Sequence, residues 1–177
     1  SGENKKNIKR IIQISSSEVY GNTINSKIKI LTENLKLKSE SPYAASKIAA
    51  DHLATTSFKS HQTPIVVARP FNTFGPRQSL RAVIPTVISQ FINTNNKKIM
   101  IGNLNSSRDF VYIKDTVDGL IKLMDAKNVL GEVINISSNN SYSVKDIIEI
   151  LSKYTKSKPQ IIVQQKRKRV SELNKLR

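Results

Sequence analysis

Two side chains suited to acid–base chemistry, Tyr43 and Lys47, lie four residues apart in the stretch SPYAASK at 41–47. Four residues is about one turn of an α-helix, so both side chains rise from the same face. A free phenol is a poor base at neutral pH because its pKa is near about 10, but an ammonium one turn away favours the phenolate. The pair can therefore remove a proton from an alcohol while hydride leaves its carbon. A solvated pair on an amphipathic helix is the alternative, because this spacing alone is unspecific.

The sequence around the pair predicts the helix that must position it. Ser41 can act as the N-cap, and Pro42 suits the first helical position. Strong helix formers and an expected apolar stripe follow at Ala44, Ala45, Ile48, Ala49, Ala50, Leu53 and Ala54.

The length and composition of the chain indicate a single domain or part of one. With 177 residues, of which 38% are hydrophobic, the chain can bury one real core but not two large ones. It has no run of about 18 apolar residues, and its first residues lack the apolar core of a signal peptide. We therefore expect a soluble, cytoplasmic protein that does not enter a membrane.

The net charge of +16 is the feature that could point to nucleic acid. Most lysines are scattered among Asn, Ile and Ser, however, and only KRKR at 166–169 is a dense cluster. We expect a solvated tail there and no nucleic-acid binding. Because there is no cysteine and there are only two histidines, His52 and His61, we expect neither disulfides nor a structural metal.

Two apolar runs flank the helix and predict parallel strands. Ile11, Ile12 and Ile14 form a short β-branched run, and residues 64–68 form a continuous apolar one, as in strands buried on both faces. The order strand, helix, strand indicates a right-handed βαβ unit. Polar, turn-rich sequences follow each strand, at 15–21 and 69–77, where an open α/β sheet places its ligand chemistry. We expect these strands to be neighbours, with Tyr43 within hydrogen-bonding reach of the Ser16 region.

The rest of the chain alternates between helical and extended patterns. Residues 22–40 are lysine-rich and irregular, which predicts a surface loop, whereas the tail from 164 to 177 is too charged to assign. Helices are expected at 82–92, 115–125 and 144–153, and strands at 98–101, 107–113, 131–136 and 161–163. The side chains expected to face inward from the first and last of these helices are Val83, Val87, Phe91, Ile147, Ile148 and Leu151.

A glycine-rich dinucleotide-binding turn is absent from the sequence. Such a turn lets backbone approach a pyrophosphate at a helix N-terminus, but no GxGxxG or GxxGxxG occurs among the six glycines. Either the chain binds no dinucleotide, or it is a fragment whose first half lies elsewhere. The lack of an initiator methionine favours the fragment.

Four motifs together resemble the extended short-chain dehydrogenase/reductases, the NAD-dependent epimerase/dehydratases of nucleotide sugars. They are SSSEVYG at 15–21, SPYAASK at 41–47, RPFNTFGPR at 69–77 and RDFVYIKD at 108–115. The resemblance implies an α/β fold: a partial Rossmann-like parallel sheet with helices, and part of a smaller C-terminal substrate-binding domain. It assigns residues 1–75 to the NAD-binding domain with the catalytic residues, and 76–177 to a truncated substrate-binding region interleaved with late Rossmann elements.

The resemblance also implies roles for individual residues. Ser16 would hydrogen-bond the substrate hydroxyl, Tyr43 would be the base, and Lys47 would hold the nicotinamide ribose of NAD. The implied cofactor contacts are Tyr43, Lys47 and Pro70, and the implied substrate contacts are Ser17, Asn72, Arg81, Ile84, Pro85 and Arg108. A guanidinium such as that of Arg108 can grip phosphate oxygens with two parallel bonds, although a salt bridge to Asp109 or Asp115 is its alternative.

Glu18 separates the chemistries that the family performs. Once a C4 hydroxyl is oxidised, the C5 proton becomes acidic and a nearby carboxylate can remove it. The run RPFNTFGPRQSLRAVIP at 69–85 most resembles the nucleotide-linked N-acetylglucosamine 4,6-dehydratases of legionaminic-acid-type pathways. Those dehydratases usually carry an aspartate where this chain has Ser17, and Ser-Glu also occurs in UDP-glucuronate decarboxylases. A 4,6-dehydratase is favoured over a decarboxylase or a 4-epimerase.

A function of another class stays open on the sequence alone. The chain could be a basic α/β module that binds an anion or nucleic acid and performs no chemistry. Convergence of Ser16, Glu18, Tyr43 and Lys47 on one cleft would favour the enzyme. For the full-length enzyme the resemblance implies a nucleotide-sugar substrate, a homodimer and a role in surface polysaccharide biosynthesis. The isolated fragment is expected to be inactive.

Overall fold

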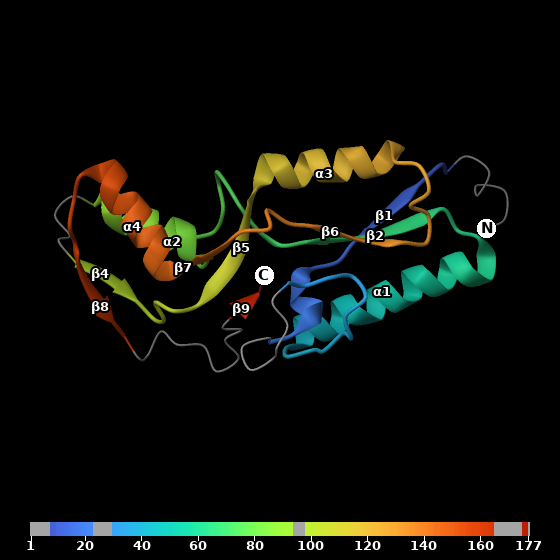
Figure 1. Cartoon of the computed structure of the whole chain (residues 1–177), viewed down its shortest axis with the longest axis horizontal. Coiled ribbons are helices and arrows are strands. Elements are labelled where there is room, and N and C mark those ends of the chain that lie inside the picture. Colours follow the sequence, from blue (N-terminus) through green and yellow to red (C-terminus); the bar gives the residue numbers. More distant parts are fainter. Residues whose placement is uncertain (1–7, 23–29, 94–97, 165–174, 177) are drawn as a thin grey trace.

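The computed structural model describes residues 8–22, 30–93, 98–164 and 175–176. Figure 1 shows an elongated arrangement in which a sheet flanked by helices continues into a smaller group of strands and helices. Within the described ranges, no helix is long and apolar enough to span a membrane, and no group of three or more His, Cys, Asp or Glu side chains is placed to hold a metal.

The first sheet is parallel and has the order β1-β2-β6, formed by β1 (Ile11–Ile14), β2 (Ile65–Pro70) and β6 (Val133–Ile136). Ile11 pairs with Ile65 and Ile14 with Ala68, which confirms the predicted parallel neighbours. Helices α1 (Pro42–His61) and α3 (Ile113–Asp125) lie on opposite sides of this sheet (Figure 1). The predicted βαβ unit and the predicted α/β fold class are therefore confirmed.

The α1 stripe differs in three positions from the sequence expectation. Ala44 and Ala54 are buried and Ile48 packs against the core, but Ala45 and Ala49 are exposed and Leu53 is 73% exposed. The inward face also carries Asp51, which is 2% exposed. Position 53 falls outside this face because 44, 51 and 54 lie on one side of a 3.6-residue helix.

The second part of the fold combines short strands with two amphipathic helices. β5 (Ser107–Tyr112) pairs in parallel with β3 (Asn72–Phe74) and β9 (Lys175–Leu176), and antiparallel with β7 (Ser141–Ser143). β4 (Lys98–Ile101) pairs in parallel with β8 (Gln160–Val163). Helices α2 (Val83–Ile92) and α4 (Val144–Thr155) pack together beside them.

The core between α2, α4 and β4 bears out the predicted inward positions. Val87, Ile99 and Ile148 are at most 2% exposed. The other expected core residues, Val83, Phe91, Ile147 and Leu151, are buried or packed against this cluster. α3 begins at Ile113, two residues before the predicted start, so β5 passes directly into it.

The segment from residue 30 to 40 is more than a surface loop. It is irregular, as expected, but Leu31 is 5% exposed and joins a core cluster with Val19, Tyr20, Phe71 and Val111. Two further leucines of the segment, Leu35 and Leu37, pack against the same cluster. The sequence analysis gave weight to the lysines of this segment and not to Leu31, Leu35 and Leu37, which lie among them and face the core. Residues 23–29 and the cluster at 166–169 lie outside the described residues.

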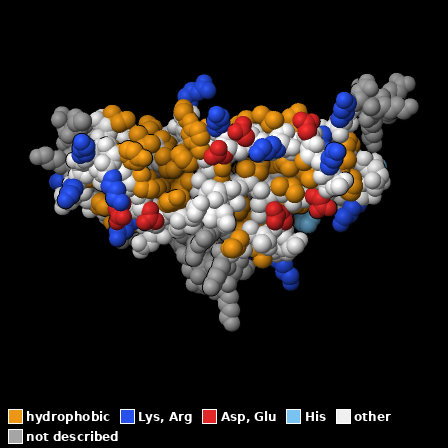
Figure 2. Space-filling model, turned by 45° about the horizontal axis from the view of Figure 1, so that its top comes forward, with side chains coloured by type: hydrophobic (Ala, Val, Ile, Leu, Met, Phe, Trp, Pro, Cys, Tyr) orange, Lys and Arg blue, Asp and Glu red, His pale blue; other side chains and the backbone are white. Residues whose placement is uncertain are grey.

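Charged side chains are spread over the face that carries α3. Figure 2 shows Lys and Arg side chains interspersed with Asp, Glu and hydrophobic groups on this face. The exposed hydrophobic side chains of α3 include Val117, Ile121 and Met124. The expectation that the chain binds no nucleic acid stays a prediction, as does the division at residue 75.

Candidate active site

The carboxyl end of β1 passes into a short 3-10 helix, η2 (Ser17–Tyr20), that carries Glu18. Ser16 caps this helix: its Oγ accepts a hydrogen bond from the Glu18 backbone N–H at 3.2 Å. Ser17 is 2% exposed, so it faces the core. The tight turn therefore separates the three residues, and Glu18 is the one that it presents to a cavity.

The start of α1 positions Tyr43 and Lys47 as the sequence predicts. Ser41 Oγ accepts a hydrogen bond from the Ala44 N–H at 3.1 Å, and proline is the first helical residue. Lys47 Nζ lies 5.7 Å from the centroid of the Tyr43 ring and donates to the Ile14 carbonyl at 2.9 Å. Lys47 thus ties the helix to the end of β1.

Tyr43 is half exposed and lines the cavity. Within the described part of the chain its hydroxyl makes no hydrogen bond to Ser16, whose Oγ serves as the cap. A half-exposed phenol whose ring faces an ammonium can meet a substrate hydroxyl without breaking an existing bond. The approach of Tyr43 to the Ser16 region stays a prediction.

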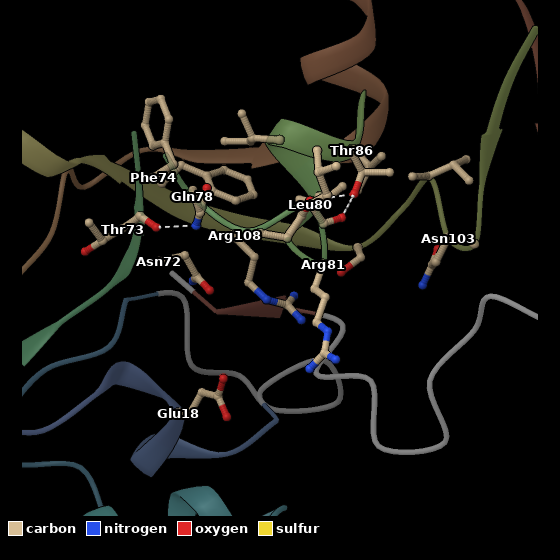
Figure 3. A pocket seen from close by; sticks show the side chains of 18 of the residues that line it. Glu18, Asn72, Thr73, Phe74, Gln78, Leu80, Arg81, Thr86, Asn103 and Arg108 are labelled. Atoms are coloured by element: carbon tan, nitrogen blue, oxygen red, sulfur yellow. Dashed lines mark hydrogen bonds between the residues drawn. The ribbon is translucent and has the colours of Figure 1, made fainter. Parts of the chain in front are cut away.

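A cavity of about 810 Å³ opens between these elements and the second part of the fold. Figure 3 shows Glu18 on one side of it, with Asn72, Arg81 and Arg108 opposite. The predicted site residues that line it are Glu18, Tyr43, Asn72, Arg81, Ile84 and Arg108. Five predicted residues are not part of its wall: Ser16, Ser17, Lys47, Pro70 and Pro85. Two arginines from different elements, a carboxylate and a phenol therefore share one space.

Arg108 and its neighbour Asp109 point to opposite faces of β5. The Asp109 side chain is fully buried, and its carboxylate accepts hydrogen bonds from the Ser138 backbone N–H at 3.0 Å and hydroxyl at 2.7 Å. Arg108 lines the cavity and donates from Nη1 to the Ser107 carbonyl at 2.8 Å. Asp109 is therefore committed elsewhere, which argues against a salt bridge between Arg108 and Asp109.

Gln78 is a cavity residue that the sequence did not reveal. Its Nε2 donates to the Thr73 carbonyl at 2.9 Å, drawn as a dashed line in Figure 3. Its Oε1 is buried and has no hydrogen-bond partner among the described residues. An unsatisfied buried acceptor is costly. The only sequence signal was its place directly after the turn-rich motif at 69–77.

A second carboxylate, Glu40, lines the cavity near Tyr43. The hydrogen bond and charge of Lys38, whose Nζ lies 2.9 Å from Glu40 Oε1, lower the pKa of this carboxyl. Glu40 therefore stays ionised at neutral pH. Other cavity residues outside the sequence prediction are Thr86, Asn103 and Ser106.

Comparison with known proteins assigns the fold and site to a class. Residues 3–137 match the NAD dependent epimerase/dehydratase family. The chain belongs to this family of extended short-chain dehydrogenases/reductases, whose members include nucleotide-sugar dehydratases and epimerases.

Particular relatives include both kinds of enzyme. A dTDP-D-glucose 4,6-dehydratase of Dictyostelium discoideum is 32% identical over 79% of this chain and 34% of the relative. The solved UDP-glucuronic acid 4-epimerase of Bacillus cereus, in complex with UDP-glucuronic acid and NAD, is 34% identical with a TM-score of 0.78, covering 91% of this chain and 51% of that chain. TunA, an NAD-dependent NDP-hexosamine 5,6-dehydratase of tunicamycin biosynthesis, is 27% identical with a TM-score of 0.82, covering 96% and 54%.

The chain spans between about a third and a half of the length of these relatives. NAD is the cofactor of the family by its description, and solved members contain NAD or NADPH. The expected family and cofactor class are thereby confirmed, whereas the legionaminic-type specificity is not tested.

Proposed function

We propose that this chain carries the substrate site and the acid–base residues of an NAD-dependent nucleotide-sugar 4,6-dehydratase. In that reaction C4 is oxidised, water is eliminated across C5 and C6, and hydride returns to C6. The observation that carries the proposal is the shared cavity, which Glu18, Tyr43, Arg81 and Arg108 all line. Of the four residues expected to converge on one cleft, Glu18 and Tyr43 line it, and this partial convergence supports the enzyme over a basic module without chemistry.

Tyr43 and Glu18 would divide the proton transfers between them. Tyr43, with the Lys47 ammonium beside its ring, would take the proton of the C4 hydroxyl. Glu18 would take the C5 proton once C4 is a ketone. Ser17 is buried and a serine is a weak acid, so protonated Glu18 would itself return its proton to the departing C6 hydroxyl.

NAD, when bound, supplies the hydride acceptor and donor at C4 and C6. The chain fits this cofactor in part: Tyr43 and Lys47 lie one helical turn apart beside the end of β1 and suit the nicotinamide ribose, and Pro70 ends the neighbouring strand β2. The sequence contains no glycine-rich turn for the pyrophosphate. We therefore propose that the 177-residue chain alone is inactive.

Arg81 and Arg108 would hold the diphosphate of the nucleotide sugar, with Ile84 beside the base. Arginine pairs suit a diphosphate because each guanidinium offers parallel donors to phosphate oxygens. Pro85 is not part of the cavity wall, so Ile84 is the better placed of the two expected base contacts. Asn72 lies beside Arg108 on the side opposite Glu18 (Figure 3), and it would contact the sugar from there.

We propose UDP-N-acetylglucosamine as the substrate. One solved relative acts on an NDP-hexosamine by its name, which supports an amino sugar. The proposal includes a cytoplasmic homodimer in surface polysaccharide biosynthesis. The second candidate is a 4-epimerase or UDP-glucuronate decarboxylase, favoured by the buried Ser17 and by the similarity to the glucuronic acid 4-epimerase.

Isotope incorporation tests the reaction in the full-length protein that carries this sequence. UDP-N-acetylglucosamine and UDP-glucuronate are offered separately with NAD in deuterium oxide. Dehydration gives a 4-keto-6-deoxy sugar with deuterium at C5. Carbon dioxide release or C4 inversion of the glucuronate, with the amino sugar unchanged, would instead establish the second candidate.

A further inference from the structure

One buried guanidinium joins three elements behind the cavity. Arg69, 3% exposed near the end of β2, donates from Nε to Asp51 Oδ2 at 3.0 Å and from Nη1 to the Tyr20 hydroxyl at 2.9 Å. Its guanidinium also lies 5.0 Å from the centroid of the Tyr20 ring. Asp51 belongs to α1 and Tyr20 to η2. One residue therefore contacts both segments that carry the proposed acid–base groups.

The Tyr20 hydroxyl extends the network to β6. It donates to Asn135 Oδ1 at 2.7 Å, while the Asn135 backbone N–H donates to Glu33 Oε1 at 2.9 Å. Asn135 Nδ2 donates to the Leu31 carbonyl at 3.1 Å. Burial raises the pKa of Tyr20 despite the opposing effect of Arg69. The phenol therefore stays protonated and can accept from Arg69 and donate to Asn135 at once.

The spacing along the sequence connects this network to the cavity. Tyr20 is two residues after Glu18 in the same short helix, and Asp51 is one helical turn beyond Lys47 and two beyond Tyr43. None of Tyr20, Asp51 and Arg69 lines the cavity. Their influence on chemistry would therefore pass through the residues that do.

A purely stabilising role accounts poorly for this arrangement. Two charges buried to this depth are expensive to desolvate, and apolar pairs of similar size are often as stable. Asp51 Oδ1 is buried and has no hydrogen-bond partner among the described residues, which adds to the cost. Hydrogen bonds between charged groups are directional, whereas apolar contacts are not. Each such bond therefore fixes the relative placement of the two elements that it joins.

We propose that Tyr20, Arg69 and Asp51 are positioning residues that fix the turn carrying Glu18 relative to the helix carrying Tyr43. The catalytic meaning of this placement rests on the proposed function, but the placement itself does not. The two can therefore be tested separately, first by a structural readout on this chain and then by kinetics on the full-length protein.

The structural test follows the Glu18 carboxyl by NMR in chains labelled with ¹³C-glutamate, with the signal assigned by Glu18→Gln. Tyr20→Phe keeps the ring and removes both hydrogen bonds of the hydroxyl. We expect it to shift or broaden the Glu18 signal and to change its pH titration, while the exposed Glu149 signal stays in place. Tyr154→Phe, at a site 84% exposed on α4, is the matched control and should change neither signal.

A double variant, Asp51→Leu with Arg69→Met, covers the case in which a single change prevents folding. It removes the buried charges together, so no unpaired charge remains. We expect it to fold and to show the same displaced Glu18 signal. A folded double variant or Tyr20→Phe chain with an unchanged Glu18 signal and titration would overturn the proposal.

Kinetics of the full-length protein then separate positioning from stability. Misplacement of an acid–base group should lower kcat by roughly tenfold to a hundredfold with KM for the nucleotide sugar nearly unchanged. A loss of kcat that only follows the folded fraction would contradict positioning. A displaced Glu18 signal in a protein that turns over no nucleotide sugar would leave positioning in place and reject the proposed function.

Discussion

Lys47 connects helix α1 to the end of strand β1. Its ammonium lies 5.7 Å from the Tyr43 ring centroid and donates a hydrogen bond to the Ile14 carbonyl at 2.9 Å. The ammonium is thereby anchored at the end of β1, where the polar turn begins. The Tyr43 phenol is half exposed beside this fixed charge, so a substrate hydroxyl can reach it while the ammonium stays in place. This relationship is the physical basis for assigning the first proton transfer to Tyr43.

Replacing Tyr43 with Phe should stop the reaction at its first step. In the full-length protein the variant keeps the ring but has no group to take the C4 hydroxyl proton, so we expect a loss of at least about a hundredfold. No NADH absorbance should form in a single turnover with UDP-N-acetylglucosamine. Tyr154→Phe is the control, and NADH formation at the normal rate in Tyr43→Phe would assign the base elsewhere.

Replacing Glu18 with Gln should separate oxidation from elimination. Gln keeps the shape of Glu and removes the base, so C4 oxidation should survive while elimination slows by roughly a hundredfold or more. In a single turnover, NADH should accumulate and decay slowly, and deuterium exchange at C5 should be slow as well. Rapid decay with normal product would show that Glu18 is not the C5 base.

Local sequence signals predicted the elements that carry the acid–base groups. The β-branched runs around β1 and β2, and the Ser-Pro start of α1, act over a few residues and need no tertiary information. The strand β3 and the cavity contact of Gln78 could not be predicted in this way. Three residues of strand carry no periodicity, and whether a glutamine oxygen is buried depends on distant packing.

The buried ion pair of Arg69 and Asp51 is a second feature that the sequence did not predict. The sequence predicted that Arg69 begins a polar, ligand-binding stretch. In the structure Arg69 is 3% exposed and its Nε donates a hydrogen bond to the Asp51 carboxylate. Asp51 lies 18 residues away in the sequence, and although its position falls on the inward face of α1, its charge predicted an exposed side chain. Charged core residues are found only when their partner is known, because burial without a partner is prohibitive.

Replacing Arg108 with Ala should weaken nucleotide binding by the chain itself, since the cavity wall lies within the 177 residues. We expect UDP to bind at least about tenfold more weakly to Arg108→Ala, because charge-assisted bonds to phosphate contribute roughly 1.5–3 kcal/mol each. Calorimetric titration with UDP measures the change. Lys145→Ala, at an exposed pair with Glu149 on α4, is the control for net charge. Equal affinities in both variants would place the diphosphate elsewhere.

NAD should bind the isolated chain poorly. Tyr43 and Lys47 can contact the nicotinamide ribose, but the sequence offers no glycine-rich turn to the pyrophosphate. We expect no binding in the micromolar range by titration calorimetry, and no turnover of UDP-N-acetylglucosamine. The UDP titration of the same preparation shows that the protein is folded. Micromolar NAD affinity would mean that the pyrophosphate is held without the glycine-rich turn.

The start of α4 should make stability depend on pH in acid. Ser143 and Asp146 form a capping box, in which the Ser143 N–H and hydroxyl both donate to Asp146 Oδ2 at 2.7 Å. These hydrogen bonds lower the pKa of Asp146. A carboxyl with a lowered folded pKa stabilises the fold above its unfolded pKa, near about 3.9, and the gain is lost as the pH falls through the folded value.

Asp146→Asn tests this dependence because the amide keeps an acceptor but not the charge. At pH 7 we expect the variant to be less stable by about 1 kcal/mol, measured by urea unfolding. The difference should shrink below about pH 4, as Asp146 of the unchanged chain becomes protonated. Glu149→Gln, at an exposed pair, should differ little from the unchanged chain at any pH. A difference for Asp146→Asn that is constant from pH 7 to pH 3 would contradict the assigned role of the charge.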